Sequence, residues 1–193
     1  MNFLDFQPAQ LLALLPEMFL VILAAVVLGL DLTLPESRRR QLGLVTAVGL
    51  FAAVALSLVF SLPDGQNGLI FGGTIRNDFA SFLFRIIFMF AGAITALISL
   101  DVEGIGRKGE YYAILIGCVI GMNFMAASAD LVMLYLSLET TSIGLYILAG
   151  FLRDDDKSTE AGLKYFLFGA LTSTVMLYGF SLLFGFTGQT NLY

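Results

Sequence analysis

A single glutamate, Glu139, stands inside the mostly apolar stretch VMLYLSLETTSIGLYILAGF (residues 132–151). An ionisable group near the centre of a bilayer costs roughly 2.5–3.5 kcal/mol on insertion scales. Glu139 lies eight residues into the apolar run, about 12 Å deep at a helical rise of ~1.5 Å per residue. Its carboxylate must therefore face the interior of a helix bundle, find a partner or water, or stay protonated. These are the properties of a group that loads and releases a proton.

Three hydroxyl-bearing residues, Thr140, Thr141 and Ser142, follow Glu139 directly. Their side chains can hold a water molecule or hydrogen-bond back to the helix that carries them. A structural alternative stays open, in which a protonated Glu139 joins two helices through a hydrogen bond. Because ionisable residues inside a membrane usually mark ion or proton pathways, we favour the functional interpretation.

Lys164 is the second candidate, four residues after Glu160 in the last apolar run. This order and spacing favour an i,i+4 ion pair at the start of a helix. Lys164 also lies only about 6 Å past Glu160, near enough for its ammonium group to reach the membrane surface. An interfacial anchor and a member of a charge relay are therefore both open for Lys164.

The remaining charges in or beside apolar runs have local structural explanations. Glu17 follows Pro16 in what reads as the first turn of a helix, where a negative charge suits the helix dipole. Glu110 opens another helix in the same way, with proton uptake as its alternative role. Arg85 stands seven residues after Asp78, so we expect these two to pair at a helix entrance. A place on a proton path and a structural role both stay open for Glu110, Glu17, Thr140 and Ser142.

The composition indicates that the elements carrying these side chains lie in lipid. Of the 193 residues, 58% are hydrophobic and 13% charged, whereas soluble domains average about 25% charged. A spanning helix needs about 20 apolar residues, and the apolar runs lack the alternation of a barrel strand. The sequence predicts an all-α polytopic membrane protein with a single transmembrane domain over residues 1–193. Its six expected helices cover roughly residues 11–32, 42–62, 80–100, 111–128, 131–152 and 160–187.

Two further patterns indicate how the helices are connected and packed. The long connection PDGQNGLIFGGTIRND (residues 63–78) alternates apolar residues with glycines, which predicts a short strand or hairpin at the membrane surface. The stretch GCVIG (residues 117–121) has a GxxxG spacing, which lets a neighbouring helix approach closely.

Positive charge is concentrated in the connections after the first, third and fifth expected helices. Because Lys and Arg of short loops stay in the cytoplasm, these connections are expected there and the N-terminus on the opposite side. Only Arg76 lies in a connection on that opposite side. The seven cytoplasmic cations are Arg38, Arg39, Arg40, Arg107, Lys108, Arg153 and Lys157.

Several classes of chemistry find no support in the sequence. The chain has no histidine and one cysteine, Cys118, so it offers neither a cysteine cluster nor an obvious metal site. It has no glycine-rich phosphate loop. A formal charge of −5 spread over short loops gives no basic face for nucleic acid. We therefore expect no cofactor and no metal in this chain, and lipid as its surroundings.

Several stretches together resemble the N subunit of proton-pumping NADH:quinone oxidoreductase, respiratory complex I. They run through all six expected helices in order, and the last two are the most specific. The stretches are LLPE (14–17), NDFASFLF (77–84), GEYYAIL (109–115), LVMLYLSLETTSIGLYILAGF (131–151) and STEAGLKYFLFGALTSTVMLYGFSLLFGFTG (158–188). The chloroplast and cyanobacterial version of the complex has a similar subunit.

The resemblance implies the N-terminal part of an antiporter-like fold and a role in proton translocation. Glu139 looks like the family's glutamate on the fifth helix, and Lys164 like its lysine on the sixth. NADH, FMN, iron–sulfur clusters and quinone are then expected in other subunits, with the other membrane-arm subunits as partners. The implied location is a bacterial plasma membrane, with a thylakoid or another energy-converting membrane as the alternative.

The chain departs from this family in length. Family members have about fourteen helices, with further buried lysines beyond the sixth, so this chain is expected to be a fragment or one part of a split subunit. Two other functions stay open: a scaffold of the membrane arm that conducts nothing, and part of a stand-alone sodium/proton antiporter.

Overall fold

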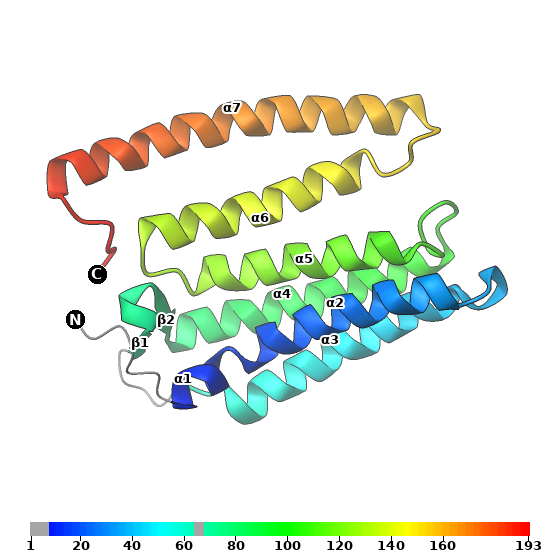
Figure 1. Ribbon diagram of the computed structural model, residues 1–193, viewed down its shortest axis with the longest axis horizontal. Coiled ribbons are helices and arrows are strands. Elements are labelled where there is room, and N and C mark those ends of the chain that lie inside the picture. The colour runs from blue at the N-terminus through cyan, green and yellow to red at the C-terminus, as the bar shows by residue number, and fades with distance from the viewer. Residues whose placement is uncertain (1–7, 64–67) are drawn as a thin grey trace.

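The computed structural model describes residues 8–63 and 68–193, and it is almost entirely helical (Figure 1). Six of the described helices are long and apolar enough to cross a membrane, which confirms the expected number. These six are α2 (Leu15–Thr33), α3 (Arg40–Phe60), α4 (Phe79–Ile98), α5 (Gly109–Ala126), α6 (Leu131–Ala149) and α7 (Asp156–Thr187). The short elements are helix α1 (Pro8–Ala13), strands β1 (Gly68–Ile70) and β2 (Ile75–Asn77), and 3₁₀ turns at Glu36–Arg38, Phe71–Gly73 and Ser99–Asp101.

The first expected helix is broken, which corrects the continuous span predicted over residues 11–32. Leu14 has φ −98° and ψ 3°, and it separates α1 from α2. Pro16 has no N–H group, so it cannot donate to the carbonyl of Leu12 four residues earlier. The break leaves carbonyl oxygens of the last turn of α1 open to partners from other helices.

The sixth expected helix begins four residues earlier than predicted. The carboxylate of Asp155 accepts a hydrogen bond from the N–H of Lys157 at 2.9 Å, and this N-cap starts α7 at Asp156. Charged residues predicted to lie in the preceding connection therefore belong to the helix. A prediction from apolar residues alone leaves such charged residues outside it.

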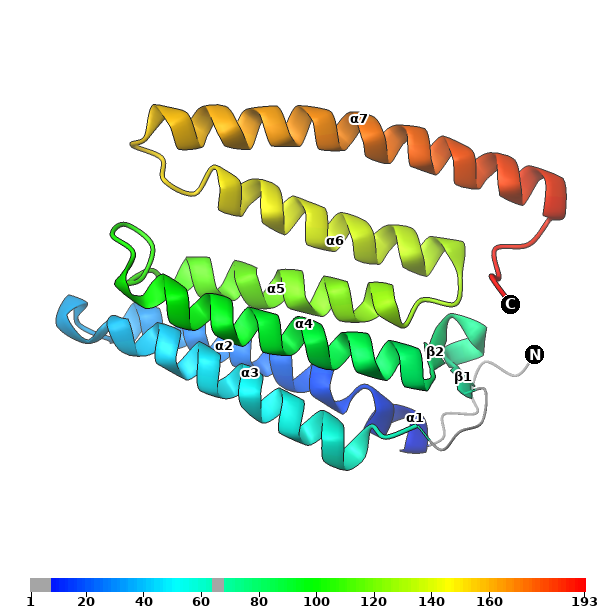
Figure 2. The same ribbon diagram turned by 180° about the vertical axis from the view of Figure 1, so that it is seen from behind.

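The buried core lies among α2, α3, α4 and α5. Helix α6 lies beside this core, and α7 lies on the far side of α6 (Figure 2). Helix α6 packs on α5, and α7 packs on α6. Only two of the 32 residues of α7, Gly162 and Ser173, are buried. The molecule therefore has a closed side built from four helices and an open side formed by α7.

Helices α5 and α6 pack closely at one of the two glycines of the GxxxG stretch. A Cβ added to Gly121 would lie 2.4 Å from Oγ1 of Thr141, so a larger residue there would force the helices apart. No described atom lies within 4 Å of a Cβ added to Gly117. The close approach predicted from the motif is therefore confirmed at Gly121, whereas no described residue packs against Gly117.

The expected hairpin forms, and it anchors the turn between α5 and α6. Strands β1 and β2 pair antiparallel with Leu69 opposite Arg76. The N–H of Arg76 donates to the carbonyl of Ala127 at 2.7 Å, and the N–H of Ala129 donates to the carbonyl of Thr74 at 2.9 Å. These bonds fix the start of the helix that carries Glu139.

The connections after α2, α4 and α6 meet at one end of the bundle, and the hairpin lies at the other (Figure 1). The seven cations counted in the sequence thus gather at one end. The orientation expected for the N-terminus concerns residues 1–7, which lie outside the described residues.

Candidate functional site

Glu139 lies on the side of α6 that faces α7. Residues seven apart share a face of a helix, and Tyr146, seven residues after Glu139, packs on α7. Its ring centroid lies 4.8 Å from that of Tyr165 and 6.0 Å from that of Phe166. Ser137 and Thr141, two positions on either side of Glu139, are buried, and the close contact at Gly121 places both of them against α5.

The side chain of Glu139 is partly buried, and one of its carboxyl oxygens has no hydrogen-bond partner among the described residues. Its Oε1 atom is shielded from solvent, and it has no hydrogen-bond partner within the described part of the chain. A buried acceptor left unsatisfied costs about 1–3 kcal/mol. A water molecule that donates to Oε1 removes this cost, so the carboxyl group is suited to bind water between the helices.

The hydroxyl groups after Glu139 mostly bond back to their own helix, as the sequence suggested. Thr140 is exposed and donates to the carbonyl of Leu136 at 2.8 Å, and Thr141 is buried and donates to the carbonyl of Ser137 at 3.0 Å. Ser142 is half-buried. The hydroxyl protons of Thr140 and Thr141 are therefore already engaged in hydrogen bonds within α6.

Lys164 forms the expected ion pair with Glu160, and both side chains are more than 60% exposed. Gly150 and Gly162 touch, since a Cβ added to Gly162 would lie 2.7 Å from the Cα of Gly150. Counted from this contact, the antiparallel helices place Lys164 and Glu139 nine residues apart in height, about 14 Å along the axis. The structure does not bring the two predicted proton-carrying residues together.

Glu110 lies at the end of the bundle where the basic connections meet. It is exposed and opens α5, and it lines an open cavity of about 650 Å³ together with acidic and basic side chains of three connections. Asp31 and Arg39, which lie 3.8 Å apart, belong to the same wall. The cavity forms a charged, water-accessible surface at this end.

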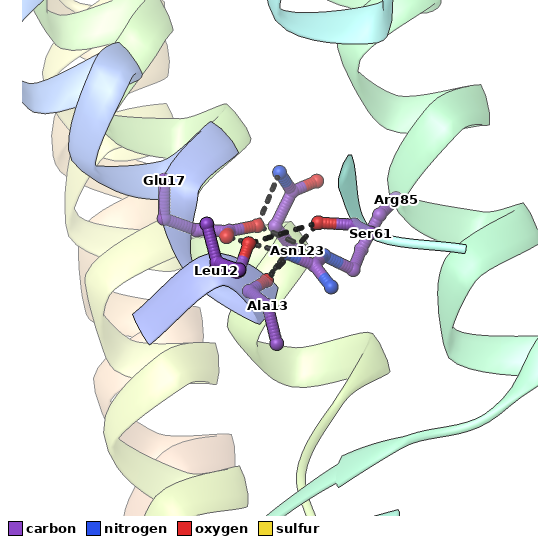
Figure 3. A network of polar contacts seen from close by, with 6 residues as sticks. All are labelled: Leu12, Ala13, Glu17, Ser61, Arg85 and Asn123. Carbon is purple, nitrogen blue, oxygen red and sulfur yellow. Dashed lines mark hydrogen bonds and ion pairs between the residues drawn. The ribbon is translucent and has the colours of Figure 1, made fainter. Parts of the chain in front are cut away.

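A second buried polar group, formed by Glu17, Arg85 and Asn123, was not found from the sequence (Figure 3). Arg85 donates from Nε to Oε1 of Glu17 at 2.9 Å and from Nη2 to Oε2 of the same carboxylate. Nδ2 of Asn123 donates to Oε1 of Glu17 at 3.2 Å. The three residues are at most 3% exposed. We call these three residues the Glu17 cluster.

The break before α2 completes the Glu17 cluster. Arg85 also donates from Nη2 to the carbonyl of Ala13 at 2.9 Å. The hydroxyl of Ser61 lies 3.4 Å from the carbonyls of both Leu12 and Ala13. Carbonyls left without helical partners therefore join the cluster, which ties together α1, α2, α4, α5 and the end of α3 (Figure 3).

The pairing predicted for Arg85 is wrong. Asp78 instead caps α4 by accepting from the N–H of Ser81 at 2.9 Å, and it pairs with Arg76 at 3.1 Å. The long-range partner of Arg85 is 68 residues away in sequence. The sequence did hold a signal: Glu17, Arg85 and Asn123 are polar residues in three separate apolar runs, and burial requires such groups to meet.

Comparison with known proteins gives one family model and many relatives. Residues 128–193 match the model described as "NADH:quinone oxidoreductase/Mrp antiporter, TM". NADH-quinone oxidoreductase subunit N of Anaeromyxobacter sp. (strain Fw109-5) is 41% identical over 92% of this chain and 35% of its own length. That of Moorella thermoacetica is 41% identical over 94% of this chain and 38% of its own. Subunit N 1 of Roseiflexus castenholzii is 34% identical over 97% and 41%.

Solved structures show the same fold. A chain of respiratory complex I from Thermus thermophilus matches with a TM-score of 0.74 and 27% identity, over 92% of this chain and 38% of that one. A chain of an archaeal membrane-bound sulfane sulfur reductase matches with the same TM-score at 22% identity, a likeness of fold alone, over 94% and 38%. This chain thus spans between 35% and 41% of the length of the relatives named above.

Proposed function

Because this chain is a homologue of NADH-quinone oxidoreductase subunit N, we propose that it takes part in proton translocation in the membrane arm of a complex I-type enzyme. The observation that carries this proposal is Glu139, whose buried Oε1 atom lacks a hydrogen-bond partner among the described residues of a spanning helix. The partners of the chain are then the other membrane-arm subunits, and lipid surrounds the rest.

Glu139 acts in this proposal as the group that binds and releases a proton. In its ionised form the carboxylate accepts an excess proton that is passed along water molecules entering between the helices, which neutralises a charge that the bilayer disfavours. It releases the proton when a cation approaches or when its surroundings become wetter. NADH, FMN, iron–sulfur clusters and quinone belong to other subunits, whose redox reaction supplies the free energy.

In the same proposal, Lys164 and Glu110 act at the exposed surface of the chain. Lys164 is an exposed cation of α7 paired with Glu160, and in this proposal it exchanges this partner for groups outside the chain. Glu110 takes up protons at the charged cavity. With the basic connections on the cytoplasmic side of a bacterial plasma membrane, that cavity opens to the cytoplasm.

The substitution Glu139→Gln in the assembled complex tests the proposal. Glutamine keeps the size of the side chain but cannot bind and release a proton. We expect quinone reduction coupled to proton pumping, measured in sealed vesicles, to fall at least tenfold at equal amounts of assembled complex.

Glu103→Gln is the matched control, since Glu103 is exposed in the connection after α4, and it should leave pumping unchanged. Pumping by Glu139→Gln at the normal rate and stoichiometry would show that Glu139 is a structural residue of a scaffold. Purification of the subunit without any redox subunit would instead indicate a stand-alone antiporter.

A further inference from the structure

The register between α6 and α7 identifies the residue that faces Glu139. The two helices are antiparallel, and they touch where Gly150 meets Gly162. Glu139 precedes Gly150 by 11 residues, and Ser173 follows Gly162 by 11 residues. Eleven residues make about three turns of helix, so both residues return to the face of the first contact. The two side chains therefore lie at the same height on facing surfaces.

Contacts on both sides of this level follow the same register. Above it, Tyr146 packs on Phe166 and its hydroxyl lies where a Cβ of Gly169 would be. Below it, Tyr135 and Leu177 line opposite walls of one apolar groove between the helices. Counting inward from either side brings position 139 opposite position 173. The pairing does not depend on one contact alone.

Ser173 is an unusual residue to find buried on this helix. Helix α7 leaves large apolar side chains such as Leu171 and Val175 more than 60% exposed, yet Ser173 is 8% exposed. Other serines and threonines of α7, such as Thr172 and Thr174, are exposed and bond to carbonyls of their own helix. A small hydroxyl side chain at this position supplies a hydrogen-bond donor on the face of α7 that is turned toward α6.

We propose that Ser173 is a positioning residue for the proton exchange of Glu139. Its hydroxyl hydrogen-bonds to the carboxyl group through one water molecule held between the two helices. The hydroxyl can donate to a carboxylate and accept from a carboxylic acid, so it orients Glu139 in both protonation states. This inference rests on the proposed function of Glu139 and extends it to a second helix.

A double-mutant cycle on the assembled complex tests this inference. We expect Ser173→Ala to slow proton pumping in sealed vesicles about tenfold, which corresponds to ~1.4 kcal/mol, without a change in the amount of assembled complex. Adding Ser173→Ala to Glu139→Gln should slow pumping no further, because Ser173 acts through that carboxyl group. Thr174→Val, which removes an exposed hydroxyl one position away, should leave pumping at the normal rate.

Three results would overturn the inference, and they are distinguishable. If Glu139→Gln slows pumping but Ser173→Ala does not, the positioning role of Ser173 is wrong and the proposed function stands. Independent effects that multiply in the double variant would assign Ser173 to packing. If Glu139→Gln itself leaves pumping unchanged, the proposed function fails, and the role of Ser173 fails with it.

Discussion

Glu17 and Glu139 are both glutamates in membrane-spanning helices, but their surroundings differ. The carboxylate of Glu17 accepts hydrogen bonds from Arg85 and Asn123 in the packed core of α2–α5. Glu139 lies on the open side between α6 and α7, and its Oε1 atom has no partner within the described residues. The charge of Glu17 is compensated by fixed neighbours, whereas the described residues supply no partner for the Oε1 atom of Glu139.

This difference contrasts a carboxylate that is fixed by its neighbours with one whose Oε1 atom has no partner among the described residues. The carboxylate of Glu17 is held by two charge-assisted hydrogen bonds from one guanidinium group, which fix its position. A carboxyl group without a fixed partner loses no such hydrogen bonds when it changes between its ionised and its protonated form. The Glu17 cluster therefore holds helices together, and Glu139 is the carboxyl group for which we propose proton exchange.

The largest effect is expected at the Glu17 cluster. Arg85→Leu leaves Glu17 buried without its cation, which should destabilise the folded subunit by about 3–5 kcal/mol. The loss should appear as a lower unfolding temperature in detergent and a smaller amount of assembled complex. The double variant Glu17→Leu with Arg85→Leu removes both charges and should recover most of the stability. A single variant as stable as the parent would show that the cluster is not structural.

A smaller effect on stability is expected where the two regions meet, at the contact of α5 with α6. Gly121→Val places methyl groups against Thr141, which should cost about 1–3 kcal/mol through overpacking. Gly117→Val is the matched control, because nothing described lies within 4 Å of an added Cβ there. Equal loss of stability in the two variants would contradict the packing seen at Gly121.

The smallest effect on stability is expected at Lys164 on the open side. Its ion pair with Glu160 is exposed, and such pairs contribute at most about 1 kcal/mol. Lys164→Gln should therefore leave the unfolding temperature nearly unchanged while it lowers the pumping rate, though less than Glu139→Gln does. Normal pumping by Lys164→Gln would restrict this residue to anchoring the helix at the membrane surface.

The two regions also differ in how far the sequence predicts them. Glu139 stands out because one charge in a long apolar run is a local signal, and the six helices follow from the same runs. The partner of Arg85 could not be predicted locally, since it depends on which faces of α2, α4 and α5 meet. Asp78 is nearer in sequence, but the N–H of Ser81 and the side chain of Arg76 already occupy it. The break at Leu14 was also not predicted, because it involves both Pro16 and hydrogen-bond donors that are distant in the sequence.

Infrared difference spectroscopy of the assembled complex during turnover tests most directly whether Glu139 exchanges protons. A protonated carboxyl group has a C=O stretching band that shifts in heavy water, and it appears or disappears as the proton binds or leaves. We expect one such band in the parent complex and in Glu103→Gln, and its loss in Glu139→Gln. A spectrum in which Glu139→Gln retains every carboxyl band of the parent would contradict proton exchange at this residue.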